Sequence, residues 1–188
     1  MKIVHLIAGI ALSATPSLAE ETTQLDAHEH GVGQLNIAFD ENKIAMELHA
    51  PGADIVGFEY GAKSDADLAA IDAALQTLSD PLGLFLIPEA ASCIVITAHA
   101  KLESEDSDHD DHDEEGHDDH DKAPGHTEFH AEYLLECANL TEISAITFSY
   151  FEIFPNALEL EVQVISDKGA TAFEIERDVA KLDLRGIF

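Results

Sequence analysis

Apolar and polar residues alternate along two adjoining segments, residues 34–39 and 44–49. The apolar residues that follow this period of two are Leu35, Ile37, Phe39, Ile44, Met46 and Leu48. Such alternation is typical of strands with one buried face, and the polar residues 40–43 between them suit a turn. The pattern predicts a β-hairpin. If Phe39 pairs with Ile44, the apolar residues share one face and Gln34 lies opposite His49; a turn of two or four residues keeps this parity, whereas a turn of three would break it.

The period changes to that of a helix in residues 64–79. Ser64 or Asp65 can accept hydrogen bonds from the free N–H groups of the first turn. The apolar stripe that we expect to face the core contains Leu68, Ile71, Leu75 and Leu78. Pro81 ends the helix, and residues 82–87 form a buried segment whose type the pattern leaves open.

Strand patterns return in the second half of the chain. The expected strands and short edge elements are residues 93–100, 127–137, 146–154, 158–164, 173–175 and 182–184, with one helical turn in residues 139–144. Residues 167–169 form the turn of a second hairpin. We predict an α+β fold, mainly of antiparallel β-hairpins with one clear helix, in one domain or in two small pseudo-equivalent halves.

The first nineteen residues have the features of a secretory signal peptide. Lys2 gives a positive start, residues 3–12 are mostly apolar, and Ser17-Leu18-Ala19 supplies small residues before a cut at Glu20. No later run reaches about eighteen consecutive apolar residues, so we expect no stable membrane insertion of the mature chain. The prediction is export to an oxidising compartment, the periplasm if the source is Gram-negative.

Residues 103–121 consist almost entirely of Asp, Glu and His. No apolar residue lies between Leu102 and Ala123, so the segment cannot bury enough surface to offset the entropy of ordering it. We predict a disordered loop over residues 103–122.

The loop divides a metal-binding body into residues 20–102 and residues 123–188. Its histidines are His109, His112, His117 and His120. Because imidazole is a common ligand of transition metals and carboxylates add negative charge, the loop is a candidate collector of divalent cations. The alternative is an acidic spacer that keeps the chain soluble.

The formal net charge of the chain is −29 at pH 7. Nucleic acid and anionic membrane surfaces repel such a chain, whereas cations are attracted to it. This charge excludes nucleic acid as a partner and favours a divalent metal ion.

Two cysteines, Cys93 and Cys137, flank the acidic loop. A disulfide bond between them would close the base of the loop, and it fits an oxidising compartment. The alternative, that both are metal thiolates, lacks the CxxC spacing of thiolate sites.

Other histidines lie on the predicted strands. In the first hairpin the period of two puts His28, His30 and His49 on the polar face near one end, an arrangement suited to three metal ligands. The alternative is that they are ordinary polar residues on a solvated strand face. His126 and His130 share a face of the strand after the loop, with Glu128 between them.

Imidazole with carboxylate suits zinc best, and nickel, cobalt and copper(II) remain open. His99 lies near the mouth of the loop, where a solvated side chain is at least as expected as a ligand.

Several separated blocks carry a family resemblance over essentially the whole mature chain. They are HEHG at 28–31, QLNI at 34–37, APGADIVGFE at 50–59, HTEF at 126–129, AEY at 131–133, Cys137 and Phe154-Pro155. These blocks resemble the zinc-regulated periplasmic zinc-binding proteins of the ZrgA type. The family pattern often has a histidine directly after the Phe-Glu pair, where this chain has Tyr60, so a ligand contributed there would be missing.

The resemblance implies a periplasmic protein that captures Zn²⁺ and delivers it to an ABC-type permease. It also implies a zinc site in the folded body and a second binding region in the loop. A metal buffer or chaperone without a permease is the alternative, and an adhesion-like β domain with an acidic solubilising loop is another. We expect no enzyme, because the sequence has neither an HExxH pair nor a GxSxG elbow.

Overall fold

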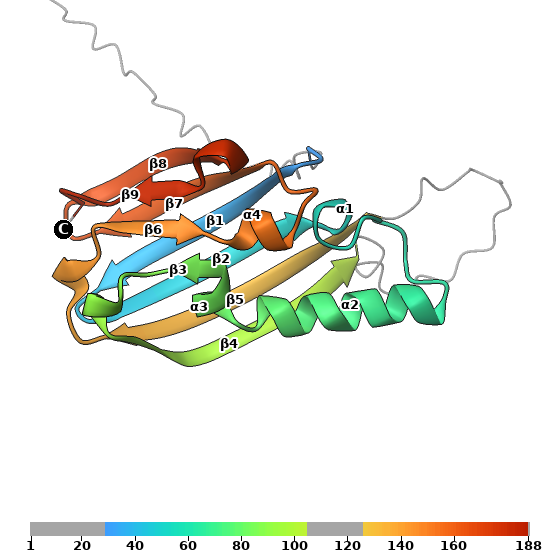
Figure 1. Ribbon diagram of the computed structural model, residues 1–188, viewed down its shortest axis with the longest axis horizontal. Coiled ribbons are helices and arrows are strands. Elements are labelled where there is room, and N and C mark those ends of the chain that lie inside the picture. The colour runs from blue at the N-terminus through green and yellow to red at the C-terminus, as the bar shows by residue number, and fades with distance from the viewer. Residues whose placement is uncertain (1–28, 105–125, 188) are drawn as a thin grey trace, which may run out of the picture.

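The computed structural model describes residues 29–104 and 126–187, so the predicted signal peptide and most of the acidic loop lie outside the described residues. Its main feature is a six-stranded sheet with the strand order β4-β5-β2-β1-β7-β8 (Figure 1). The strands are β1 (Val32–Asp40), β2 (Lys43–Pro51), β4 (Cys93–Ser104), β5 (Thr127–Cys137), β7 (Glu159–Ser166) and β8 (Gly169–Glu176). Neighbouring strands are antiparallel except β1 and β7, which are parallel. The α+β prediction is confirmed.

A second layer lies over one face of this sheet (Figure 1). A three-stranded sheet of order β3-β6-β9 forms part of it, with short helices around it. Its elements are α1 (Gly52–Ile55), α2 (Asp65–Leu78), α3 (Pro81–Leu84), β3 (Phe85–Leu86), η1 (Glu89–Ala91), η3 (Leu140–Glu142), β6 (Ala145–Phe148), α4 (Tyr150–Ile153), η4 (Arg177–Val179) and β9 (Lys181–Asp183). No helix in the described ranges is long and apolar enough to cross a membrane.

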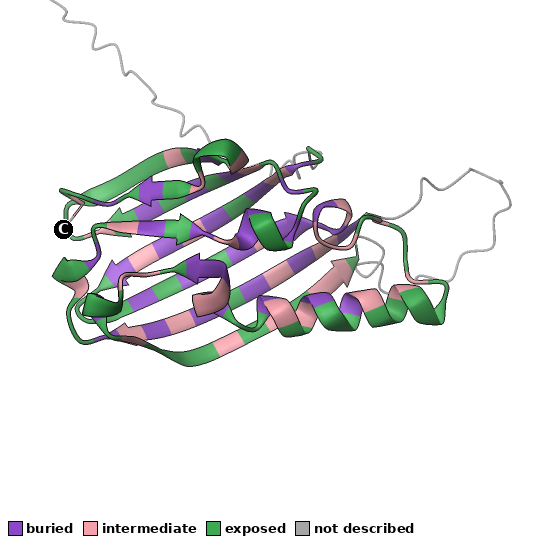
Figure 2. Cartoon of the chain, in the orientation of Figure 1, coloured by how far each residue is buried: buried purple, intermediate pink, exposed green. Residues whose placement is uncertain are grey.

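The core fills the space between the two layers. Buried and more exposed residues alternate along the central strands (Figure 2), because successive side chains of a strand point to opposite faces. In one cross-strand row Leu35, Leu48 and Ala131 are buried in the core. The adjoining row carries His49 and His130 on the other, polar face.

Both predicted hairpins are confirmed. Phe39 pairs with Ile44 and Gln34 with His49 in the β1–β2 hairpin. The β7–β8 hairpin closes with Ser166 opposite Gly169. Hairpins from both halves of the sequence therefore enter one sheet, joined through the parallel pairing of β1 and β7, which no local pattern indicated.

The predicted disulfide bond joins Cys93 and Cys137, the first residue of β4 and the last residue of β5. The two strands that enter and leave the acidic loop are antiparallel, as predicted. β4 continues to Ser104, beyond the expected end at residue 100, so residues 103 and 104 belong to the strand rather than to the loop.

The expected strand over residues 146–154 is wrong in its second half. β6 ends at Phe148, and Ser149 adopts a helical conformation that begins the turn of α4. A helical turn brings Tyr150 and Phe154 onto one side, with their ring centroids 5.2 Å apart, and buries both. Burial of these aromatic rings overrides the strand preference of the run.

The helix prediction is confirmed in its limits and its cap. The Ser64 side chain accepts a hydrogen bond from the N–H of Asp67, whose carboxylate accepts in turn from the N–H of Ser64. Leu68, however, is 55% exposed, because the first turns of α2 extend beyond the end of β4 (Figure 1). The buried stripe of the helix therefore starts at Ile71.

Candidate metal centre

Two groups of potential metal ligands lie where β2 ends and β5 begins. We call His30, Glu59 and His126 the turn group, and His49, Glu128 and His130 the strand group. Within each group, one potential ligand atom from every residue lies within 4.8 Å of the others. Each group thus combines two imidazoles with one carboxylate.

The strand group follows directly from the register of β2 and β5. His49 pairs with His130, and their ring centroids are 3.9 Å apart. Glu128 precedes His130 by one full strand period and so shares its face. Its Oε2 lies 2.6 Å from His130 Nε2 and 3.5 Å from His49 Nδ1, which leaves the three side chains facing one point.

The turn group is assembled around one carboxylate oxygen. Glu59 Oε2 lies 2.9 Å from His30 Nε2 and 2.7 Å from His126 Nδ1. The Glu59 side chain is only 13% exposed, whereas the His30 and His126 side chains are 66% and 48% exposed. The group therefore has an anchored acid and two imidazoles that solvent reaches.

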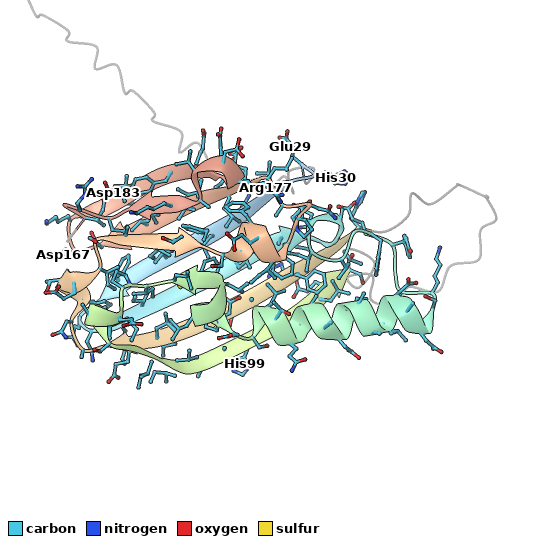
Figure 3. The ribbon with its side chains drawn as sticks, viewed as in Figure 1. Glu29, His30, His99, Asp167, Arg177 and Asp183 are labelled. Carbon is cyan, nitrogen blue, oxygen red and sulfur yellow. A yellow bond between two sulfur atoms is a disulfide. The ribbon has the colours of Figure 1, made fainter. Side chains whose placement is uncertain are left out.

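The backbone around His30 is held from both sides. Gly31 has a φ of +91°, which favours glycine, and its N–H donates to Asp54 Oδ1 at 2.8 Å. The Gly31 carbonyl accepts hydrogen bonds from the N–H groups of Leu158 and Glu159. The backbone of the exposed His30 is thus held in place through Gly31, just before β1 begins (Figure 3).

The short helix α1 carries the chain from β2 towards Glu59. A Cβ atom at Gly52 would lie 2.4 Å from Thr127 Oγ1, so only glycine allows α1 to approach the start of β5 this closely. This approach brings the Glu59 segment beside His126. Tyr60, the departure from the family pattern, stacks on Phe58 with ring centroids 4.8 Å apart.

The charges of the site favour cation binding. Burial opposes ionisation of Glu59, but hydrogen bonds with His126 and His30 outweigh it and lower the pKa of this carboxyl. The pKa of His49 is raised, chiefly by its hydrogen bond with Glu128 and against the effect of burial. The Glu59 carboxylate is therefore ionised at neutral pH, and protons compete with metal for His49.

This donor set matches a known zinc chemistry. Zn²⁺ is bound by imidazole nitrogen and carboxylate oxygen, and three protein ligands with one open position are usual outside structural sites. Because imidazole must be neutral to bind a metal, metal binding by both groups is coupled to the release of protons.

The predicted ligands divide between the two groups. We expected His30 and His49 to act together on one hairpin face, but His30 belongs to the turn group and His49 to the strand group. The reason is that β1 begins only at Val32, so His30 lies in a turn before the ladder. His126 and His130 are divided in the same way.

Five other predicted ligands lie outside the described residues: His28, His109, His112, His117 and His120. His99 lies on β4, away from His30 (Figure 3), and belongs to neither group. Sequence reasoning missed Glu59 as a ligand, since only the tertiary fold brings it to the histidines, whereas strand parity placed Glu128 beside His130.

Comparison with known proteins agrees with this geometry. A family model described as the ZrgA family zinc uptake protein matches residues 27–184. A search of curated proteins found no match. The match covers both groups and nearly all of the described chain, and the chain therefore belongs to the ZrgA family of zinc uptake proteins.

Proposed function

We propose that this protein captures Zn²⁺ in the periplasm through the turn group and the strand group and delivers it to an ABC-type importer. The observation that carries the proposal is the pair of His₂Glu sets at one end of the sheet, in a chain of a zinc uptake family. The disulfide bond and the predicted signal peptide support a compartment outside the cytoplasm.

The exposure of the ligands supports a cargo role for the metal. A structural zinc site is closed by four protein ligands, whereas the turn group offers three. The imidazoles of the turn group are open to solvent, so a metal ion can enter and leave without opening the core. Zinc bound in this way is available to a second protein.

The acidic loop adds a further element to the proposal. Its four histidines and many carboxylates provide weak, exchanging ligands, which raise the local concentration of Zn²⁺ near the body. His126, at the return of the chain into β5, is itself a member of the turn group.

Calorimetric titration of Zn²⁺ tests the proposal. The proteins to compare are the intact mature chain, a form with residues 105–125 replaced by a Gly/Ser linker, and paired variants of each group on that form. These are His30→Ala with His126→Ala, and His49→Ala with His130→Ala. His99→Ala is the matched control, because it removes a strand histidine that belongs to neither group.

The linker form should keep its tighter sites and lose weaker ones. Each paired variant should then remove one site, while His99→Ala leaves both. If all binding disappears with residues 105–125, the body groups do not bind zinc, and the chain acts as a scaffold for a chelating loop.

A further inference from the structure

Glu103 on β4 faces the strand group from the neighbouring strand. It pairs directly with Glu128 across the β4–β5 ladder. Its Oε2 lies 3.3 Å from His130 Nε2, the same nitrogen that lies 2.6 Å from Glu128 Oε2. Two carboxylates from adjacent strands thus converge on one side of one imidazole.

This arrangement is unfavourable without a cation. Like charges directly opposite each other on antiparallel strands destabilise the pairing. The ion pairs around the strand group join three carboxylates, those of Glu47, Glu103 and Glu128, with one ammonium, that of Lys101. With neutral imidazoles their net charge is two negative units, which a divalent cation balances.

Glu103 and Glu47 occupy different positions relative to the two rings. Glu47 Oε1 lies 3.3 Å from His49 Nε2, whereas Glu128 approaches the other nitrogen of that ring, Nδ1. Glu47 is therefore on the far side of the His49 ring, where a carboxylate orients a metal-bound imidazole by accepting its N–H. Glu103 lies on the side of His130 where the metal would bind.

We propose that Glu103 is a fourth ligand of the strand group, which becomes a His₂Glu₂ site for a divalent cation. The inference rests on the proposed function, because it takes Zn²⁺ as the ion. Four nitrogen and oxygen donors satisfy the tetrahedral preference of zinc. The Glu103 side chain is 44% exposed and pairs with Lys101 through its other oxygen, Oε1, which leaves Oε2 beside His130 Nε2.

Two pKa shifts agree with ionised ligands. The Lys101 ammonium holds the pKa of Glu103 below its ordinary value. A hydrogen bond from Asn36 lowers the pKa of Glu47. Both carboxyl groups therefore ionise more readily than an ordinary glutamate.

The test is a Zn²⁺ titration of the full-length mature protein, followed through the imidazole NMR signals of His49 and His130. Glu103→Gln is compared with Glu132→Gln, which removes the same charge on the other side of the His49–His130 row, opposite Glu47. Loss of an outer-sphere partner alone weakens metal sites about 10–100-fold, so Glu103→Gln should weaken the strand group at least about tenfold. Glu132→Gln should change it by no more than about threefold, as for a solvated charge.

The same spectra separate the outcomes. Unchanged His30 and His126 responses in Glu103→Gln show that the variant is folded and that its turn group is intact. Equal effects of Glu103→Gln and Glu132→Gln overturn the inference, because Glu103 would then act only through its charge. If His49 and His130 do not respond to Zn²⁺ in the unsubstituted protein, the proposed zinc site at the strand group fails instead.

Discussion

Removal of the disulfide bond should lower the stability of the protein strongly while leaving metal binding nearly intact. Cys93 and Cys137 are separated by 44 residues, and the chain-entropy model gives about 4 kcal/mol for closing a loop of this length in the unfolded state. The double variant Cys93→Ser with Cys137→Ser should therefore lose about 4 kcal/mol of the free energy of unfolding.

The position of the bond explains why zinc binding should be spared. His130 lies about 23 Å from Cys137 along β5 at the usual rise per strand residue. The ladder between them is fixed by core side chains, including Tyr133 and Leu135, which are buried on the opposite face. In the folded double variant, zinc affinity at the strand group should change by less than about threefold.

The assay is urea unfolding of both proteins in the presence of a chelator, with zinc calorimetry of each under native conditions. Reduction of the unsubstituted protein should reproduce the loss measured in the double variant. A loss of less than about 1 kcal/mol would refute the loop-closure argument and indicate that the reduced chain remains restrained in its unfolded state. A tenfold fall in zinc affinity would refute the separation of the disulfide from the metal groups.

Three further predictions concern the pH dependence of zinc binding, the pH dependence of stability and the support of the turn group. Zinc affinity should fall as the pH is lowered from about 7.5 to 5.5, because protons compete with the metal for imidazole. The fall reaches about a hundredfold per pH unit where both imidazoles of a group are protonated. A constant affinity would contradict histidine ligands. In the metal-free protein the raised pKa of His49 contributes to the free energy of unfolding. This contribution is complete below about pH 6.5 and is lost as the pH rises through the pKa of the folded state. His49→Gln should therefore flatten the dependence of urea stability on pH between about pH 6 and 8. Asp54→Ala should lower the free energy of unfolding by about 2 kcal/mol and weaken zinc binding at His30, because the buried N–H of Gly31 loses its acceptor. Asp54→Asn keeps an acceptor, so it should lose less stability and less affinity in the same unfolding and titration assays.

The local parts of the fold could be predicted from the sequence. The period of two and the polar residues between the segments predicted the β1–β2 hairpin, and Gln34 pairs with His49 because Asp40 pairs with Lys43, which leaves a turn of two residues. The cap at Ser64 set the start of α2. The aromatic run at 146–154 was misassigned because a short apolar segment has no period that distinguishes a strand from a buried helical turn.

The sequence predicted which histidines belong to the candidate site better than it predicted how they divide between the two groups. Imidazole chemistry singled out His30, His49, His126 and His130, all of which lie in one of the two groups. Their division depends on where β1 begins and on how α1 brings Glu59 to His126, and both are consequences of tertiary packing. A contact between residues so distant in sequence leaves no local pattern.

Strand β5 contributes residues both to the core and to the candidate metal site, because its side chains alternate between the two faces of the sheet. Phe129, Ala131 and Tyr133 point into the core, and Glu128 and His130, which alternate with them along the strand, lie on the polar face. A slip of one residue would turn the aromatic side chains to solvent and the ligands into the core, at the cost of both burial and hydration. The hydrophobic pattern that folds the sheet therefore also directs the ligands, which is why the register at the metal groups should survive loss of the distant disulfide.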